Sequence, residues 1–153
     1  MTKGFHSLKL SLQSNAHKLK RTIPLYLTFV FLILSCSDTK EKQLGQSSVA
    51  LFHKQFNSDR FSDIYDEASE PFRHVAPREE FVAYLTDAKH KLGVVRKTSP
   101  KNWRVDKLVT GTFVSLQYET EFSDGKAVEK FVFLINKDGA ALYRYNVHFD
   151  DIK

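Results

Sequence analysis

The sequence is poor in the residues that cross-link small domains or bind metals and phosphates. Its 153 residues include one cysteine, six glycines and four prolines. A single cysteine excludes an intramolecular disulfide, so the folded part must be stabilised by its core alone. The histidines lack Glu-x-x-His and His-x-His spacing, and neither a glycine-rich phosphate loop nor Gly-x-Ser-x-Gly occurs. We therefore expect no metal and no cofactor.

An excess of one charge is also missing from most of the chain. The sequence has 23 Lys and Arg against 18 Asp and Glu, a formal net charge of +5. Five basic residues and no acidic ones precede Cys36, which leaves 18 of each sign after it. That remainder is neutral and has no run of more than two basic residues. Because nucleic-acid binding needs a concentrated basic face, we expect no nucleic-acid partner.

One long uncharged stretch lies near the N-terminus, at residues 22–35. As a helix rising about 1.5 Å per residue it would cover about 21 Å, less than the roughly 30 Å of hydrocarbon in a bilayer. This length suits the apolar part of a signal peptide better than a membrane span, and Lys18, Lys20 and Arg21 precede it. We predict that residues 1–35 are an export signal.

The residues that end this stretch are Ile33, Leu34, Ser35 and Cys36. They resemble the bacterial lipobox, which has an aliphatic, a variable and a small residue before a cysteine. The resemblance implies cleavage before Cys36 and its acylation, and two or three acyl chains anchor a protein stably. We expect a lipoprotein of the bacterial cell envelope, and Ser37 favours the outer membrane if the host is Gram-negative. The alternative is an incidental cysteine in an uncleaved anchor.

The remaining chain is predicted to be a tether and one domain. Residues 36–48 contain the lipidated cysteine and a polar tether, and residues 49–153 form a single domain. Apolar residues recur at helical spacing in three segments, which begin near Val49, Phe61 and Pro77. Pro71 is predicted to end the second helix and Gly93 the third.

After Gly93 the apolar period changes from 3.6 to about 2, which is typical of strands. Candidate strands cover residues 94–105, 112–122, 128–135 and 141–149, and turns at 123–125 and 137–139 separate the last three. Helices followed by an antiparallel sheet predict an α+β fold, with three helices packed on one face of a sheet of about four strands.

Core positions spread over residues 48–149 carry a resemblance to a known superfamily. They are Ala50-Leu51-Phe52, Phe56-Asn57, Phe61-Ser62-Asp63-Ile64-Tyr65, Ala68-Ser69, Phe72-Arg73, Glu79-Glu80-Phe81, Leu92-Gly93 and Tyr143-Arg144-Tyr145-Asn146-Val147. The pattern resembles the cystatin-like, nuclear-transport-factor-2-like superfamily, and within it small bacterial envelope proteins of unknown function. The resemblance implies a curved sheet around a long helix with a conical pocket between them. Its members include isomerases, dehydratases, binding modules and dimers, so fold does not decide the activity.

Four tyrosines are candidates for lining such a pocket, because they lie on apolar faces: Tyr65, Tyr118, Tyr143 and Tyr145. Enzymes among the relatives use Asp, His and Tyr as acid or base groups. No spacing in this sequence forces a catalytic pair, so we interpret these tyrosines as core or pocket-lining residues and assign no catalytic residue.

A second candidate is the polar face of the last strand. Arg144, Asn146 and His148 are two residues apart, so they point the same way. They form either a patch for a ligand or partner, or the solvent-facing side of an antiparallel sheet, and we favour the second.

The sequence therefore favours a membrane-anchored, non-catalytic domain that binds a small apolar ligand or an envelope protein. One alternative is an isomerase- or dehydratase-like enzyme that uses the conical pocket. Another is a structural module that forms a homodimer through its sheet.

Overall fold

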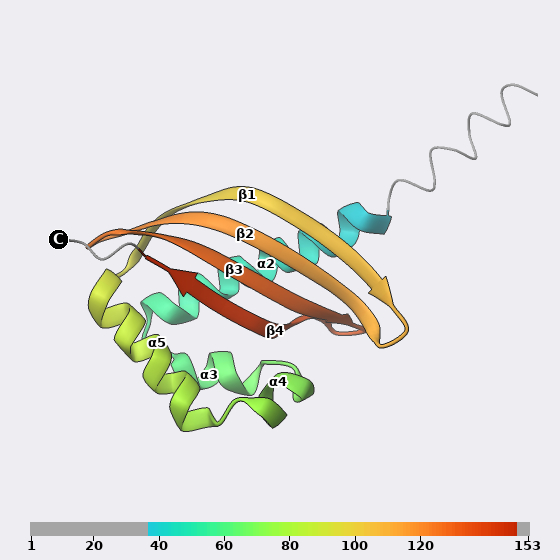
Figure 1. The fold of residues 1–153 in the computed structure, drawn as a ribbon, viewed down its shortest axis with the longest axis horizontal. Coiled ribbons are helices and arrows are strands. Elements are labelled where there is room, and N and C mark those ends of the chain that lie inside the picture. The colour runs from blue at the N-terminus through green and yellow to red at the C-terminus, as the bar shows by residue number, and fades with distance from the viewer. Residues whose placement is uncertain (1–36, 150–153) are drawn as a thin grey trace, which may run out of the picture. The chain divides into compact units, whose positions relative to one another are not determined.

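The computed structural model describes residues 37–149 and has the α+β fold that the sequence predicts (Figure 1). Helices come first and an antiparallel four-stranded sheet follows. The elements are α2 (Ser37–Asn57), α3 (Phe61–Asp66), α4 (Glu70–Val75), α5 (Arg78–Leu92), β1 (Val95–Leu108), β2 (Gly111–Phe122), β3 (Lys126–Asn136) and β4 (Gly139–His148). Within residues 37–149, no helix has the length and apolar content needed to cross a membrane.

Helix α2 begins at Ser37, well before the apolar period that starts at Val49. The residues predicted to be a tether therefore form its first turns instead. The polar composition of this segment hides the helix, because its contact with the sheet involves a glycine. Gly45 is buried, and a Cβ there would lie 2.9 Å from Leu116 Cδ1 and 3.1 Å from Val114 Cγ1. The missing side chain lets the helix backbone lie directly on β2.

Helices α3 and α4 have six residues each, and the longer α5 ends at a glycine. The second predicted helix, α3, ends at Asp66, and Pro71 does not end it. Pro71 instead lies in the first turn of the additional helix α4, where a missing backbone N–H is tolerated. Helix α5 confirms the third predicted helix: it follows Pro77 and ends at Gly93, whose φ is 78°.

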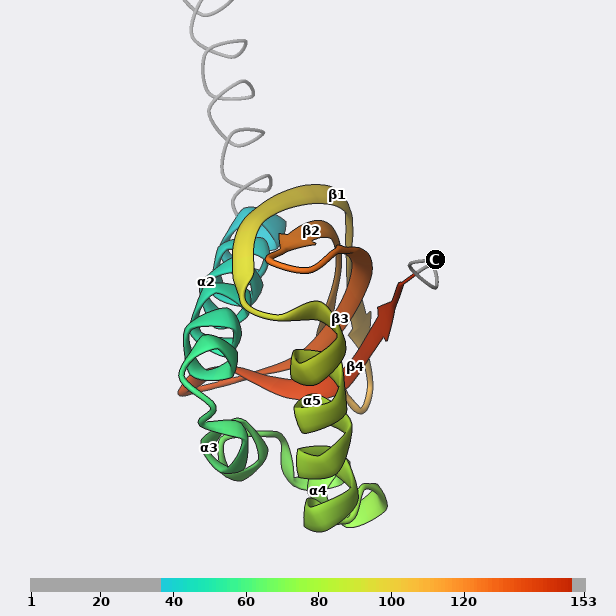
Figure 2. The same cartoon turned by 90° about the vertical axis from the view of Figure 1, so that its left-hand side faces the viewer.

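The strands lie in sequence order, β1-β2-β3-β4, and each is antiparallel to the next. Strand β1 runs past its expected end to Leu108 and passes through Pro100. A register shift between Pro100 and Asn102 accommodates the proline, as a β-bulge on an edge strand can. Figures 1 and 2 show the strands curving together across α2.

A register shift between β3 and β4 changes which side chains of β4 face the helices. Tyr143 has no partner in the β3 ladder, so the alternation reverses at this residue. Leu142 is buried on the same face as Tyr145, whereas Tyr143 packs on the opposite face with its ring centroid 5.0 Å from that of Phe113. Tyr143 and Tyr145 are both predicted to line one pocket, and this register shift places them on opposite faces of the sheet instead.

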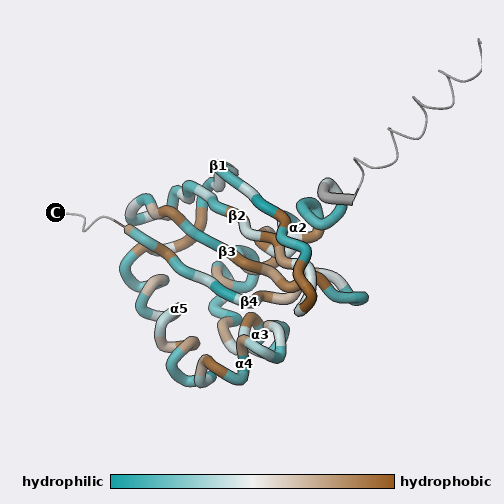
Figure 3. The backbone as a smooth tube through the Cα atoms, turned by 45° about the vertical axis from the view of Figure 1, so that its right-hand side comes forward, coloured by the Kyte–Doolittle hydropathy of each residue, from teal (hydrophilic) through white to brown (hydrophobic). Residues whose placement is uncertain are grey.

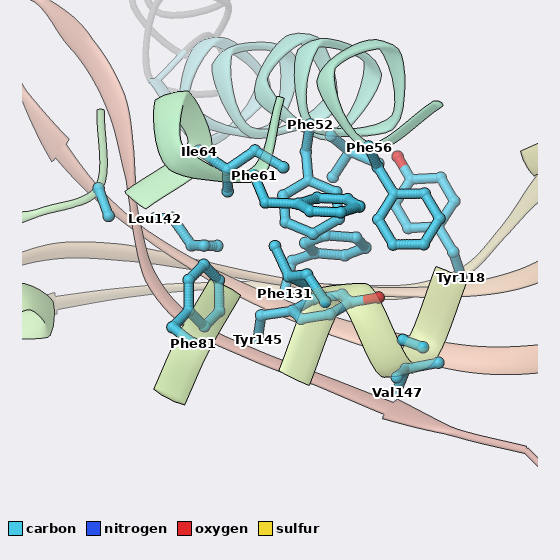
Figure 4. Packing of buried hydrophobic residues seen from close by; sticks show 14 of the residues in the cluster. Phe52, Phe56, Phe61, Ile64, Phe81, Tyr118, Phe131, Leu142, Tyr145 and Val147 are labelled. Carbon is cyan, nitrogen blue, oxygen red and sulfur yellow. The ribbon is translucent and has the colours of Figure 1, made fainter. Parts of the chain in front are cut away.

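The hydrophobic core lies between the helices and one face of the sheet, which we call the inner face (Figure 4). The ring centroid of Phe52 on α2 lies 5.2 Å from that of Phe131 and 4.6 Å from that of Tyr145. None of the described helices covers the opposite face, which we call the outer face (Figure 2). Along the chain, the edge strand β1 is largely hydrophilic, whereas β3 is hydrophobic over its second half (Figure 3).

Candidate functional site

A carboxylate buried on the inner face is the first candidate. Glu129 on β3 is only 1% exposed. Its Oε2 accepts hydrogen bonds from Thr120 Oγ1 at 2.5 Å and from His53 Nε2 at 2.8 Å. Its Oε1 accepts a hydrogen bond from the Tyr145 hydroxyl at 2.7 Å. These four residues, which we call the Glu129 cluster, come from α2 and three neighbouring strands.

The ladder explains why these groups meet. Thr120 pairs with Ala127, and Tyr145 pairs with Phe131. Ala127 and Phe131 lie two residues before and after Glu129 on β3. Thr120 and Tyr145 therefore lie diagonally to Glu129 on the same face. A buried carboxylate that accepts three such hydrogen bonds is satisfied without water.

The charge of Glu129 also affects its neighbour. Burial raises the pKa of Tyr145 well above its ordinary value, and the negative charge and hydrogen bond of Glu129 raise it further. The phenol therefore keeps its proton at neutral pH and remains a donor. Burial also raises the pKa of Tyr118, and a hydrogen bond with Gln46 opposes part of this rise.

Aromatic rings occupy the space beside the Glu129 cluster. The ring centroids of Phe52 and Phe131 lie 5.9 Å and 5.7 Å from that of His53. A recess of about 60 Å³ lies between α2, α3 and β4, far below the roughly 300–1,000 Å³ of ordinary ligand pockets. The Glu129 cluster therefore fixes α2 on the sheet, and Glu129 lines none of the hollows described for residues 37–149.

The tyrosines predicted to line a pocket lie in three environments. Tyr65 is buried among the helices, and its hydroxyl donates to backbone carbonyls in and after α4. Tyr118 and Tyr145 are buried on the inner face, with ring centroids 6.2 Å and 5.0 Å from that of Phe131. Tyr143 lies on the outer face. The structure therefore places Tyr118 and Tyr145 beside the same ring, that of Phe131, and places Tyr65 and Tyr143 elsewhere.

The outer face of the sheet is hollowed. Two hollows of about 340 and 380 Å³ adjoin there, and we call them together the outer trough. They share four residues that form one row across the strands: Arg104, Ser115, Val132 and Arg144. The remaining side chains differ at the two ends. One end includes Asn102, Gln117, Lys130 and Asn146, and the other includes Asp106, Leu108, Thr110, Phe113 and Tyr143.

Three cations line the outer trough. Arg104 Nε donates to Asp106 Oδ2 at 2.9 Å. Lys130 and Arg144 are exposed, and neither has an acidic partner among residues 37–149. An open hollow with two uncompensated cations can attract a negatively charged group.

The patch predicted from the last strand lies on this outer face. Arg144, Asn146 and His148 are all exposed. Arg144 and Asn146 line the outer trough, and His148 is not among its lining residues. The other predicted site residue, Cys36, lies outside the described residues. The described chain has no group of His, Cys, Asp or Glu side chains arranged for a metal ion.

Sequence reasoning missed two groups of site residues, and they differ in how visible they were. Glu129 had a signal, because it alternates in phase with Ala127 and Phe131 on a buried strand face, and a buried acid needs donors. Of the outer trough, the last strand gave Arg144 and Asn146, whereas Arg104 and Lys130 had no signal, because strand order and register alone place them in one hollow with Arg144.

Comparisons with known proteins give a family without an activity. The model of a domain described as a protein of unknown function, DUF4019, matches residues 50–144. The chain is also similar to a solved structure from Catenulispora acidiphila, with 16% identity, 78% of this chain and 96% of that chain covered, and a TM-score of 0.47. A search of curated proteins gives no match. Since the matched residues make up more than half of the sequence, the protein belongs to the DUF4019 family.

Proposed function

We propose that this protein is a non-catalytic binding module that holds a partner in the outer trough of its sheet. The observation that carries the proposal is the contrast between the two faces. Aromatic rings fill the inner face, whereas the outer face has adjoining hollows of about 340 and 380 Å³. These volumes fall in the range of binding sites.

We propose further that the module is anchored in the bacterial envelope through Cys36. The short apolar stretch that ends in the only cysteine supports this location. The fold is compatible with it, because α2 begins at Ser37, directly after the proposed lipidated residue. The domain would then follow its membrane anchor without a long linker, and its partner would be a component of the same envelope.

The binding proposal is tested by filling the outer trough. Ser115 lines both hollows, so Ser115→Trp would occupy their shared centre. We expect this variant to lose the partners that wild-type protein captures by chemical cross-linking in its host. Ser62→Trp, on an exposed position of α3, makes the same change elsewhere and should keep them. Equal capture by the two variants would contradict a binding site in the trough.

The anchor is tested by Cys36→Ala. We expect this variant to lose acylation and to leave the membrane fraction, because the acylated thiol is gone. Ser35→Ala keeps a small residue before the proposed cleavage site and should remain acylated. An unacylated wild-type protein that keeps residues 1–35 would show that the N-terminal segment is an anchor of another kind.

The contact between His53 and Glu129 supports one alternative function, an isomerase- or dehydratase-like reaction, because it pairs a base with an acid. This candidate requires the inner face to open, since Glu129 is 1% exposed. It predicts turnover of a hydrophobic ketone or hydroxyacyl substrate that Glu129→Gln abolishes. The binding proposal predicts no turnover by either protein.

A further inference from the structure

We infer that the outer trough binds an extended peptide segment with acidic residues followed by a large apolar residue. This inference rests on the proposed function, since it names the chemistry of the partner that the trough holds. Three features support it: the two unpaired cations, Lys130 and Arg144, the spacing of these and Arg104 across the sheet, and the apolar end of the trough.

The cations set the sign of the partner's charge. Residues 37–149 supply no acidic partner for Lys130 or Arg144, although both line a hollow of about 340 Å³. Arg104 differs, because Asp106 accepts a hydrogen bond from its Nε at 2.9 Å. The remaining lining at this end includes the neutral amides of Asn102 and Gln117, which can donate to carboxylates and backbone carbonyls. The field in this end is therefore positive, and an acidic segment complements it.

The spacing of the cations fits an extended chain. Arg104 and Arg144 occupy the same row on the first and fourth strands, and three inter-strand spacings of about 4.8 Å separate their backbones by about 14 Å. Lys130 lies in the adjacent row, between these edges. In an extended peptide, residues i and i+4 point the same way and lie about 13 Å apart. Acidic residues at i, i+2 and i+4 therefore match the width of the cationic end.

The other end of the trough is apolar. Phe113 and Tyr143 form an edge-to-face pair with ring centroids 5.0 Å apart, and Leu108 lines the same hollow of about 380 Å³. Leu108 is 61% exposed, although leucine is usually buried. An apolar side chain two residues after the last acidic one points to the same side of an extended peptide, so it would cover this surface and add hydrophobic stabilisation to the ion pairs.

The shape of the trough favours a peptide over a lipid. Both hollows lie on a sheet face that no described helix covers. A bound acyl chain gains from burying most of its surface, as ligands in closed pockets do. A peptide has polar backbone groups that remain hydrated on its open side, so an open trough suits it better.

The test uses the full chain in a non-ionic detergent and a fluorescein-labelled peptide, Glu-Ser-Glu-Ser-Glu-Phe-Leu. We expect fluorescence anisotropy to detect binding of this peptide and none of the matched peptide with Lys in place of Glu. Lys130→Glu combined with Arg144→Glu should weaken binding by about tenfold or more, since two exposed ion pairs become repulsive contacts. Lys54→Glu combined with Lys137→Glu gives the same net charge at exposed positions outside the trough and should change binding by less than about twofold.

Three results would overturn the inference. The first is equal binding of the acidic and basic peptides, and the second is equal weakening of binding by the two double variants. The third is that the peptide does not bind, whereas phosphatidylglycerol vesicles bind in a way that depends on Lys130 and Arg144. If the trough reversal unfolds the protein, Lys130→Gln with Arg144→Gln replaces it. Failure of this inference is distinguishable from failure of the proposed function. Suppose that Ser115→Trp loses partner capture and the charge-reversal variant keeps it. This result would contradict the acidic-peptide inference and would still support a binding module.

Discussion

Glu129 is the residue whose replacement should affect stability most sharply, because three donors depend on it. Thr120, His53 and Tyr145 all donate to its carboxylate, and all are buried. Glu129→Leu leaves each donor without this acceptor, and unsatisfied buried donors cost about 1–3 kcal/mol each. We expect the free energy of unfolding to fall by about 3 kcal/mol or more, measured by urea titration at neutral pH.

The matched control is Glu121, another glutamate, which forms an ion pair between β2 and β3. Glu121 lies 3.4 Å from the Lys126 ammonium, and both side chains are well exposed. Glu121→Leu should change stability by less than about 1 kcal/mol, the usual upper value of an exposed pair. Similar losses in the two variants would contradict the structural role of the Glu129 cluster.

Tyr145 gives this cluster a pH dependence in the alkaline range. Its pKa is raised in the folded chain by burial and by the charge of Glu129, while the unfolded chain titrates near the ordinary value of about 10. As the pH rises past 10 the unfolded chain loses this proton first, so the stability contributed by the raised pKa is present below pH 10 and declines above it. Urea titrations from pH 8 to 11 should show a steeper loss for the wild type than for Tyr145→Phe. Parallel curves would mean that Tyr145 ionises as easily in the folded protein as in the unfolded chain. Tyr118, whose pKa is also raised, contributes to both proteins equally.

At the scale of elements, α2 depends on its close approach to β2 at Gly45. In an exposed helix, Gly→Ala stabilises by about 1 kcal/mol through helix propensity. Here the added Cβ would lie 2.9 Å from Leu116 Cδ1 and 3.1 Å from Val114 Cγ1, which requires the helix or the strand to move. We expect Gly45→Ala to lower the free energy of unfolding by about 1–3 kcal/mol, the usual cost of overpacking. Ser47→Ala, at an exposed position of the same helix, should be neutral or slightly stabilising. A stabilised Gly45→Ala protein would contradict the contact.

Gly45 also shows where the sequence stops predicting this fold. Apolar periodicity located α5, β2 and β3, because each buries a regular set of side chains. It missed the first half of α2, since a glycine contact leaves no apolar signal. It also placed Tyr143 on the wrong face, because period-2 counting cannot anticipate a β-bulge. Local patterns report local burial, and these two features depend on a neighbouring element.

The candidate site follows the same rule. Glu129 was detectable in principle, because one acidic residue in phase with buried apolar residues implies donors nearby. Arg144 and Asn146 were found as a strand face, and the structure places both in the outer trough. Their combination with Arg104 and Lys130 depends on strand order and register, which the sequence alone does not specify.

At the scale of the whole molecule, the two faces of the sheet have different roles, and this bears on the oligomeric state. A symmetric homodimer formed through the outer face would place each trough against a copy of itself. Lys130 and Arg144 of both copies would then lie in one interface, where the acidic lining residue Asp106 already accepts a hydrogen bond from Arg104, and an excess of like charge across an interface is unfavourable. We expect the chain from Ser37 onward to sediment as a monomer in analytical ultracentrifugation at low salt, where charge screening is weakest. Adding the acidic peptide should leave it monomeric. A dimer at low salt that Lys130→Glu with Arg144→Glu disrupts would instead make the outer face a contact between copies of this chain and would remove the trough as a site for another partner.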